Sequence, residues 1–241
     1  MSEFVERAFS AENAANYDES FRALGAIKDL MHLMLQVRFG ELPENAHLLI
    51  AGAGTGAEVR HLAPRFPNFR FTLADPSSGM LDIARAHAEA EGFADRCTFH
   101  DGYVATLDGE NFDAATSILV SHFLTDIEER GCYFQSIADR LVTGAPFFNV
   151  DLSGDRSSAD FERSMALWVS MIDFARQQDR AFEFRMQEDA PAPPSYREVF
   201  DMGIAKHAPA EVEALMRRAG FEDPTPCFQV ALMRGWFATR R

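Results

Sequence analysis

The sequence predicts an α/β fold in which helices cover both faces of a mostly parallel sheet. Short apolar segments alternate with helix-like segments from residue 47 to residue 152, a rhythm that makes each helix a crossover between parallel strands. The first apolar segment also ends in alternating glycines, Gly52, Gly54 and Gly56, directly before a helix-like segment. Tight strand-to-helix turns of this kind are typical of doubly wound sheets.

Residues 1–46 are predicted to form a helical cap. Apolar side chains recur at spacings of three and four between Leu24 and Leu35, which gives a helix one apolar stripe. Residues 39–43 contain a glycine and a proline and should end this helix. A core of residues 47–152 follows, with strands expected at 47–51, 69–74, 96–100, 112–120 and 145–152, helices at 56–65, 78–92 and 126–141, and a loop at 121–125.

The alternation breaks after the fifth predicted strand, where residues 153–208 form a helical insertion. Helices are expected at 159–180 and near 196–202, separated by a stretch rich in proline and acidic residues at 187–194 that cannot continue as helix. An insertion at the carboxyl edge of a parallel sheet suits a lid over a substrate. A structural elaboration or a contact in a homodimer are the alternatives. Residues 209–241 should complete the sheet, with a helix at 209–219 and strands at 227–232 and 235–239.

Composition limits the kind of partner. The 241 residues include 37 acidic and 23 basic side chains, for a formal net charge of −14. A field of that sign repels nucleic acid, so a small-molecule substrate is expected. Three separated cysteines, no apolar leader and no apolar run of about 20 residues predict a reduced cytoplasmic protein outside the membrane. The histidines lack metal-ligand spacing, so no metal is expected.

The glycine turn predicts a site for a nucleotide-like cofactor. Glycine lets backbone amides approach a ligand and adopts positive φ without steric cost, and the following helix adds partial positive charge. The turn also satisfies a relaxed dinucleotide fingerprint if Ala57 replaces the third glycine. An NAD(P)-dependent oxidoreductase therefore stays open at this point.

Acidic residues end the next two predicted strands. Asp75 can accept hydrogen bonds from both hydroxyls of a ribose, although Asp75 or Ser77 could also cap the following helix, and the two roles are compatible. Asp101 can accept an exocyclic amine of adenine, and Gly102 lets the backbone approach the ring. Asp-Gly is also a common plain turn.

These features, with the Phe112-Asp113-Ala114 start of the fourth strand, resemble the class I S-adenosylmethionine-dependent methyltransferases. The resemblance implies a Rossmann-like sheet of seven strands with an antiparallel last strand, S-adenosylmethionine as cofactor and S-adenosylhomocysteine as product. It implies that the cofactor-binding residues are Tyr17, Gly52, Ala53, Gly54, Asp75, Pro76, Met80, Asp101, Gly102, Ser117 and Ile118. One departure is Ile50, which stands where many members place an acidic residue.

The C-terminal half also resembles the carboxy-S-adenosylmethionine synthases of tRNA wobble-uridine modification. The similarity lies in residues 212–222 and in Cys227-Phe228-Gln229. It places Arg197 where that branch keeps an arginine for the added carboxylate, and a guanidinium suits such a group. A surface ion pair is the alternative role of Arg197. The glycine turn and the loop after the fourth strand do not follow this branch closely.

The chemistry of methyl transfer singles out one further residue. A sulfonium methyl group is already electrophilic, so the protein mainly supplies orientation, with a base only where the nucleophile carries a proton. His122, directly after the fourth strand, is the best candidate base; a structural histidine is the alternative, and Asp151 is a weaker candidate. The fourth-strand tip lacks the Asn/Asp-Pro-Pro-aromatic and Pro-Cys signatures of enzymes that methylate nucleic acid. A methyltransferase of a small molecule, an oxidoreductase and a non-catalytic cofactor-binding protein remain as hypotheses.

Overall fold

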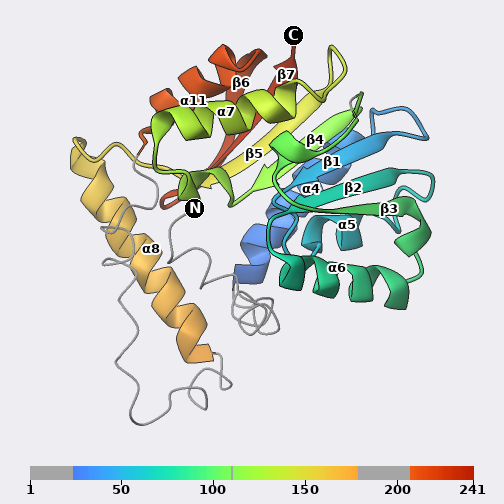
Figure 1. Cartoon of the computed structure of the whole chain (residues 1–241). Helices are drawn as coiled ribbons and strands as arrows, with labels where there is room; N and C mark the ends of the chain where they lie inside the picture. Colours follow the sequence, from blue (N-terminus) through green and yellow to red (C-terminus); the bar gives the residue numbers. More distant parts are fainter. Residues whose placement is uncertain (1–23, 110, 179–206) are drawn as a thin grey trace.

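A single seven-stranded sheet organises the computed structural model, which describes residues 24–109, 111–178 and 207–241 (Figure 1). The strand order is β3-β2-β1-β4-β5-β7-β6. Neighbours from β3 to β5 are parallel, whereas β7 is antiparallel to both β5 and β6. The strands are β1 (His47–Ala51), β2 (Arg70–Asp75), β3 (Cys97–Asp101), β4 (Ala114–Ile118), β5 (Pro146–Leu152), β6 (Phe221–Val230) and β7 (Met233–Arg240). The predicted fold class is confirmed.

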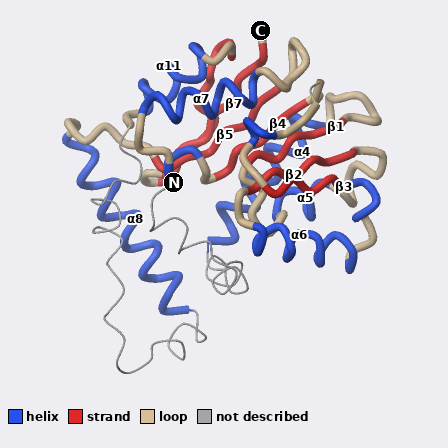
Figure 2. The backbone as a smooth tube through the Cα atoms, in the orientation of Figure 1, coloured by secondary structure: helices blue, strands red, loops and turns tan. Residues whose placement is uncertain are grey.

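Helices lie on both faces of the sheet (Figure 2). One face carries α4 (Gly25–Phe39), α5 (Ala57–Leu62) and α6 (Ser78–Ala90), and the other carries α7 (Ile127–Ala138) and α11 (Pro209–Arg218). Helix α8 (Ala159–Gln178) follows β5 and extends away from the sheet. Short 3-10 helices are η2 (Ala94–Arg96), η3 (Val104–Thr106) and η4 (Ser121–Phe123). Two buried apolar clusters hold these layers together, and successive residues of β5 enter different ones: Phe147 joins the α7 and α11 side, and Phe148 joins the α4 side.

The element boundaries differ from the sequence prediction at several points. β1 spans the predicted residues, but β4 ends two residues early, because the chain turns sharply at Leu119 with φ 59°. The largest difference is β6, which begins at Phe221 and not at residue 227. Pro224 and Pro226 argue against a strand, yet β6 is the outermost strand of the sheet, where a missing amide donor is tolerated.

The remaining predictions concern the two ends of the core. In α4, Leu30 is exposed although the apolar stripe includes it, and His32 is buried in its place. The predicted helix at 159–180 is seen as α8, whereas the predicted helix near 196–202 lies outside the described residues.

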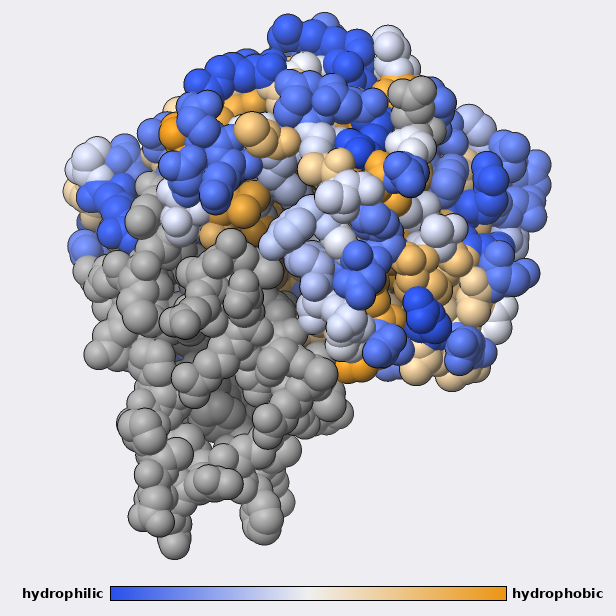
Figure 3. Space-filling model, in the orientation of Figure 1, coloured by the Kyte–Doolittle hydropathy of each residue, from blue (hydrophilic) through white to orange (hydrophobic). Residues whose placement is uncertain are grey.

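Polar side chains cover most of the described surface visible in Figure 3, in line with the net charge of −14. Among the described helices, none has the length and apolar character that crossing a membrane requires.

Candidate active site at the carboxyl edge of the sheet

The glycine turn is closed on one side and open on the other. Gly52, Gly54 and Gly56 have φ of 71°, 52° and 78°, values that residues other than glycine rarely adopt. A Cβ built on Gly52 would lie 2.3 Å from a γ carbon of Val120, so the turn packs tightly against the β4 exit. A Cβ built on Gly54 would meet no atom of the described residues within 4 Å. The backbone at Gly54 is therefore the part of the turn that a ligand can approach.

Asp75, the last residue of β2, is fastened to this turn. The Gly54 amide donates to its Oδ2 atom at 2.9 Å, and the Ser77 amide donates to Oδ1 at 2.8 Å. Burial raises the pKa of Asp75, an effect that these two hydrogen bonds oppose. A carboxylate can accept about four hydrogen bonds, so the contacts among the described residues leave Asp75 capacity for two further donors. This capacity is what recognition of a ribose requires.

The other sequence-predicted residues of β2 and β3 surround Asp75. Ser77 caps α6 by accepting from the Met80 amide at 3.4 Å, and the Met80 side chain is buried, whereas Pro76 is exposed. Asp101 is the register partner of Asp75 on β3 and is exposed. The Gly102 amide donates to the backbone oxygen of Asp75 at 3.0 Å. The strand ends that the sequence singled out thus lie together.

Gly102 and Ser117 have neighbours within the protein. A Cβ on Gly102 would lie 2.9 Å from Oγ1 of Thr106, so a larger residue here would have to displace the Thr106 side chain. Ser117 at the end of β4 is buried, and its hydroxyl lies 2.8 Å from the hydroxyl of Tyr133, while Ile118 is half-buried. Burial raises the pKa of Tyr133 and keeps its hydroxyl protonated, so it can also donate to the Ala51 oxygen at 3.5 Å. Tyr133 therefore joins β4 to the start of the glycine turn.

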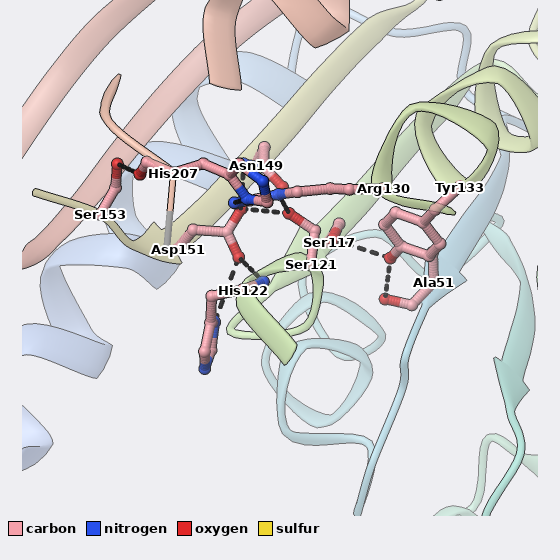
Figure 4. Close-up of polar contacts among 10 residues, drawn as sticks. All are labelled: Ala51, Ser117, Ser121, His122, Arg130, Tyr133, Asn149, Asp151, Ser153 and His207. Carbon is pink, nitrogen blue, oxygen red and sulfur yellow. Dashed lines mark hydrogen bonds and ion pairs between the residues drawn. The ribbon is translucent and has the colours of Figure 1, made fainter. Parts of the chain in front are cut away.

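His122 and Asp151 form a buried pair beside this edge (Figure 4). His122 Nδ1 lies 3.2 Å from Asp151 Oδ1, and the His122 backbone amide donates to the same oxygen at 3.0 Å. The side chains are 3% and 0% exposed, so both are withdrawn from bulk water. Figure 4 shows the opposite edge of the imidazole pointing away from the carboxylate. The two residues that the sequence considered as bases are thus in contact, and the second ring nitrogen of His122 points away from Asp151.

Arg130 of α7 holds the other side of Asp151. Its Nη2 donates to Asp151 Oδ2 at 2.9 Å, its Nε donates to the Ser121 hydroxyl at 3.0 Å, and its Nη1 donates to His207 Nδ1 at 3.1 Å. Ser121 and Asn149 also donate to Asp151 Oδ2, at 2.5 and 2.8 Å. The carboxylate therefore accepts from five different groups.

The charges of this cluster follow from its burial. Burial alone would raise the pKa of Asp151, but the Arg130 guanidinium and the hydrogen bonds from His122 and Ser121 hold it at about 2. Burial lowers the pKa of His122, and the Asp151 carboxylate offsets this only in part. At neutral pH the imidazole is therefore neutral. Because Nδ1 faces a carboxylate, we assign the proton to Nδ1 and the lone pair to Nε2.

Arg130, Tyr133, Asn149 and His207 were not identified from the sequence. The apolar pattern of the predicted helix contained a signal for the first, because Arg130 stands four residues before Phe134 and seven before Ile137, both fully buried. A charged residue on the buried stripe of a helix needs a partner in the core. The partners come from residues 121, 151 and 207, which no local pattern brings together. Tyr17 and Arg197, also predicted as site residues, lie outside the described residues.

Comparison with known proteins finds similarity to methyltransferases over part of the chain. Residues 48–144 match the family described as methyltransferase domain. The malonyl-[acyl-carrier protein] O-methyltransferase of Geobacter sulfurreducens is 40% identical over 82 residues, which cover 34% of this chain and 29% of that protein. An uncharacterized protein of a Synechococcus strain is 36% identical over 100 residues, covering 40% of this chain and 23% of that protein. The chain thus spans less than a third of the length of these curated relatives.

Solved structures match over almost the whole chain. A protein from Methanococcus maripaludis, described as a candidate S-adenosyl-L-methionine-dependent methyltransferase, superposes with a TM-score of 0.66 at 17% identity and covers 96% of this chain and 94% of that one. The mitomycin 7-O-methyltransferase MmcR superposes with a TM-score of 0.56 at 20% identity, over 82% of this chain and 49% of that one. At such identities the likeness concerns the fold.

Proposed function

We propose that the chain transfers a methyl group from S-adenosylmethionine to a hydroxyl group of a small molecule, on the premise that residues 48–144 match the methyltransferase domain family. The cofactor side of the proposal is carried by the Gly54–Asp75 arrangement. The acceptor side is carried by the His122–Asp151 pair.

The residues at the carboxyl edge fit the cofactor. Gly54 offers open backbone, and the adjacent Asp75 carboxylate has unused acceptor capacity for two hydroxyl groups. Asp101 on the neighbouring strand end is exposed and adds a second acceptor for the exocyclic amine of adenine. S-adenosylmethionine, when bound, supplies an electrophilic methyl group. Ala53, Pro76, Met80, Gly102, Ser117 and Ile118 belong to the proposed surroundings of this site.

His122 supplies the proton acceptor. Asp151 accepts a hydrogen bond from the Nδ1 proton of His122 and fixes the ring, so that the lone pair on Nε2 can accept a proton from the nucleophile. A neutral imidazole with its second nitrogen held by a carboxylate is an efficient arrangement for a general base. Such a base is needed by a hydroxyl acceptor, because that nucleophile must lose a proton during transfer. Two similar proteins carry O-methyltransferase in their names, which agrees with this choice.

Two measurements test the function. Mass spectrometry of small molecules released from purified protein should identify S-adenosylmethionine or S-adenosylhomocysteine, and calorimetry should show direct binding of both. Transfer of a labelled methyl group to a panel of phenols, alcohols and carboxylic acids then tests the acceptor class. Recovery of NAD(P) alone would overturn the assignment, and binding without transfer to any acceptor would favour a non-catalytic role.

The carboxy-S-adenosylmethionine branch makes a distinct prediction. A carboxylated cofactor would have a distinct mass in the same experiment, and its affinity would depend on Arg197. Recovery of the unmodified cofactor with unchanged affinity in Arg197→Ala would argue against this branch.

A further inference from the structure

The candidate site contains a buried arginine, Arg130, that contacts the carboxylate partner of the proposed base. Arg130 is fully buried, and each of its three guanidinium nitrogens has a different partner: the Ser121 hydroxyl, the Asp151 carboxylate and His207. These partners come from the β4 exit, from β5 and from the residue that precedes α11. Arg130 does not reach the outward edge of His122 (Figure 4). Any influence it has on the reaction must therefore pass through its neighbours.

The geometry points to one route for that influence. Arg130 Nη2 binds Asp151 Oδ2, while His122 uses the other oxygen, Oδ1, through both its ring and its backbone amide. Arg130 Nε also binds the hydroxyl of Ser121, the residue directly before His122. The guanidinium thus contacts both the carboxylate and the side chain of the residue directly before the base.

We propose that Arg130 is a positioning residue for methyl transfer, which holds Asp151 ionised and oriented so that the His122 proton stays on Nδ1 and the lone pair stays on Nε2. The proposal rests on the function proposed above and adds to it a residue that sets the protonation of the base. The planar guanidinium, with donors in fixed directions, suits three separate acceptors in a way that a lysine ammonium cannot reproduce.

The helix that carries Arg130 is built to present it. Asp126 caps α7 by accepting from the amides of Glu128 and Glu129 at 2.9 and 3.0 Å, and the Arg130 amide donates to the Asp126 oxygen at 3.1 Å. The first turn of α7 is therefore well defined. The titratable groups that surround His122 and its carboxylate within the described residues are Asp151 from β5, Arg130 and Tyr133 from α7, and His207 before α11.

The test measures the ring nitrogens of His122 by 15N NMR at a series of pH values, with the signals assigned by comparison with His122→Gln. Wild-type protein should show a protonated Nδ1 and a bare Nε2 at neutral pH. In Arg130→Gln the carboxylate loses its compensating charge, so the pKa of His122 should rise by about one unit or more. In Arg130→Lys the charge remains, and a smaller rise with a mixture of the two ring tautomers is expected.

Arg140→Gln is the matched control. Arg140 lies just after the same helix and is held by the backbone oxygens of Ala105, Leu107 and Ser136, away from Asp151. Its substitution should leave the His122 signals unchanged although it removes several partly buried hydrogen bonds. Arg130→Lys keeps the buried carboxylate compensated and serves as the variant that folds if Arg130→Gln does not.

The outcomes separate this proposal from the function it rests on. If the His122 signals of the Arg130 variants match those of Arg140→Gln, the positioning role is wrong, whatever the turnover. If no acceptor is methylated by any form of the protein, the proposed function is wrong, while the NMR titration still reports whether Arg130 controls His122. With an acceptor in hand, Arg130→Lys should lower kcat at least tenfold and leave the Kd for S-adenosylmethionine within twofold.

Discussion

The amide of Gly54 donates to the carboxylate of Asp75 at 2.9 Å, across 21 residues of sequence. The glycine turn after β1 and the acidic end of β2 are therefore one structural unit and not two separate motifs. A ligand that uses the backbone of the turn also meets a carboxylate whose position the turn itself fixes.

This unit predicts the effect of removing the carboxylate. Asp75→Ala should weaken S-adenosylmethionine binding about tenfold or more, equivalent to about 1.4 kcal/mol or more, because both the acceptor for the ribose and the fastening of the turn are lost. Calorimetry gives the Kd directly. Asp113→Ala is a suitable control, since Asp113 accepts from the His47 amide at 2.8 Å at the opposite end of β1. Equal weakening by both substitutions would show that Asp75 acts through general stability.

A second test at Gly54 separates the backbone cost of positive φ from the obstruction of the cofactor by a side chain. Gly54 and Gly92 both have positive φ, 52° and 77°, and within the part of the chain that the structure describes a Cβ on either would meet no atom within 4 Å. Alanine at either position should therefore cost a similar amount of stability, about 1–2 kcal/mol. Only Gly54→Ala should also reduce cofactor affinity, because its methyl group would project from the open part of the turn. Identical Kd values for the two variants would place the cofactor elsewhere.

The proposed base predicts a split between binding and catalysis. His122→Gln should lower kcat by about 10²–10⁴-fold, the usual range for loss of a general base, and should change the Kd for S-adenosylmethionine less than twofold. Steady-state kinetics and calorimetry measure the two effects separately. His47→Gln, which removes the hydrogen bond to Thr72 at the amino end of β1, should leave kcat intact. Full activity in His122→Gln would assign His122 a structural role.

A pair of histidines between α4 and α5 predicts how stability changes with pH. His32 and His61 stack with ring centroids 4.3 Å apart, and burial, followed by the neighbouring His61, lowers the pKa of His32 to about 4. The folded protein then binds fewer protons at this site than the unfolded chain, whose histidines titrate near 6.5. This contribution to stability is complete above that value and is lost as the pH falls from about 6.5 towards 4.

Chemical denaturation at pH 7 and pH 5 checks this prediction. His32→Gln cannot take up the proton, so the difference in unfolding free energy between the two pH values should be smaller than in the wild type. His100→Gln, on β3, should retain the wild-type difference. A pH dependence unaffected by His32→Gln would assign the acid sensitivity to other groups.

Local sequence patterns determined most of the fold and part of the site. β1 and the turn after it were predictable because a buried parallel strand and a run of glycines each have a local signature. β6 was predicted too short, because tolerance of Pro224 and Pro226 depends on its being an edge strand, which is a property of the whole sheet. In α4 the sequence predicted a buried Leu30, but His32 is buried and Leu30 is exposed. The burial of His32 depends on stacking with the imidazole of His61, which comes from another helix.

The cofactor part of the site could be predicted from local sequence patterns, whereas the cluster around Asp151 could not. Asp75 and Asp101 were predictable because each ends a strand and parallel strands end at one edge. The cluster around Asp151 was not, since its members are residues 121, 122, 130, 149 and 207, which meet only after the sheet and α7 have packed. Polar residues that act through one another leave little trace in any single segment.

The insertion after β5 begins and ends at almost the same point. The Ser153 hydroxyl donates to the backbone oxygen of His207 at 3.0 Å, so the chain leaves the core and returns to it within one hydrogen bond. The entropic cost of closing a loop between such fixed ends grows only slowly with its length. Helix α8, at the start of the insertion, contributes Phe161, Met165, Trp168 and Ile172 to the buried cluster of the sheet. Changes in chain length between the end of α8 and His207 are therefore expected to cost the sheet little stability, whereas loss of α8 itself should cost much more.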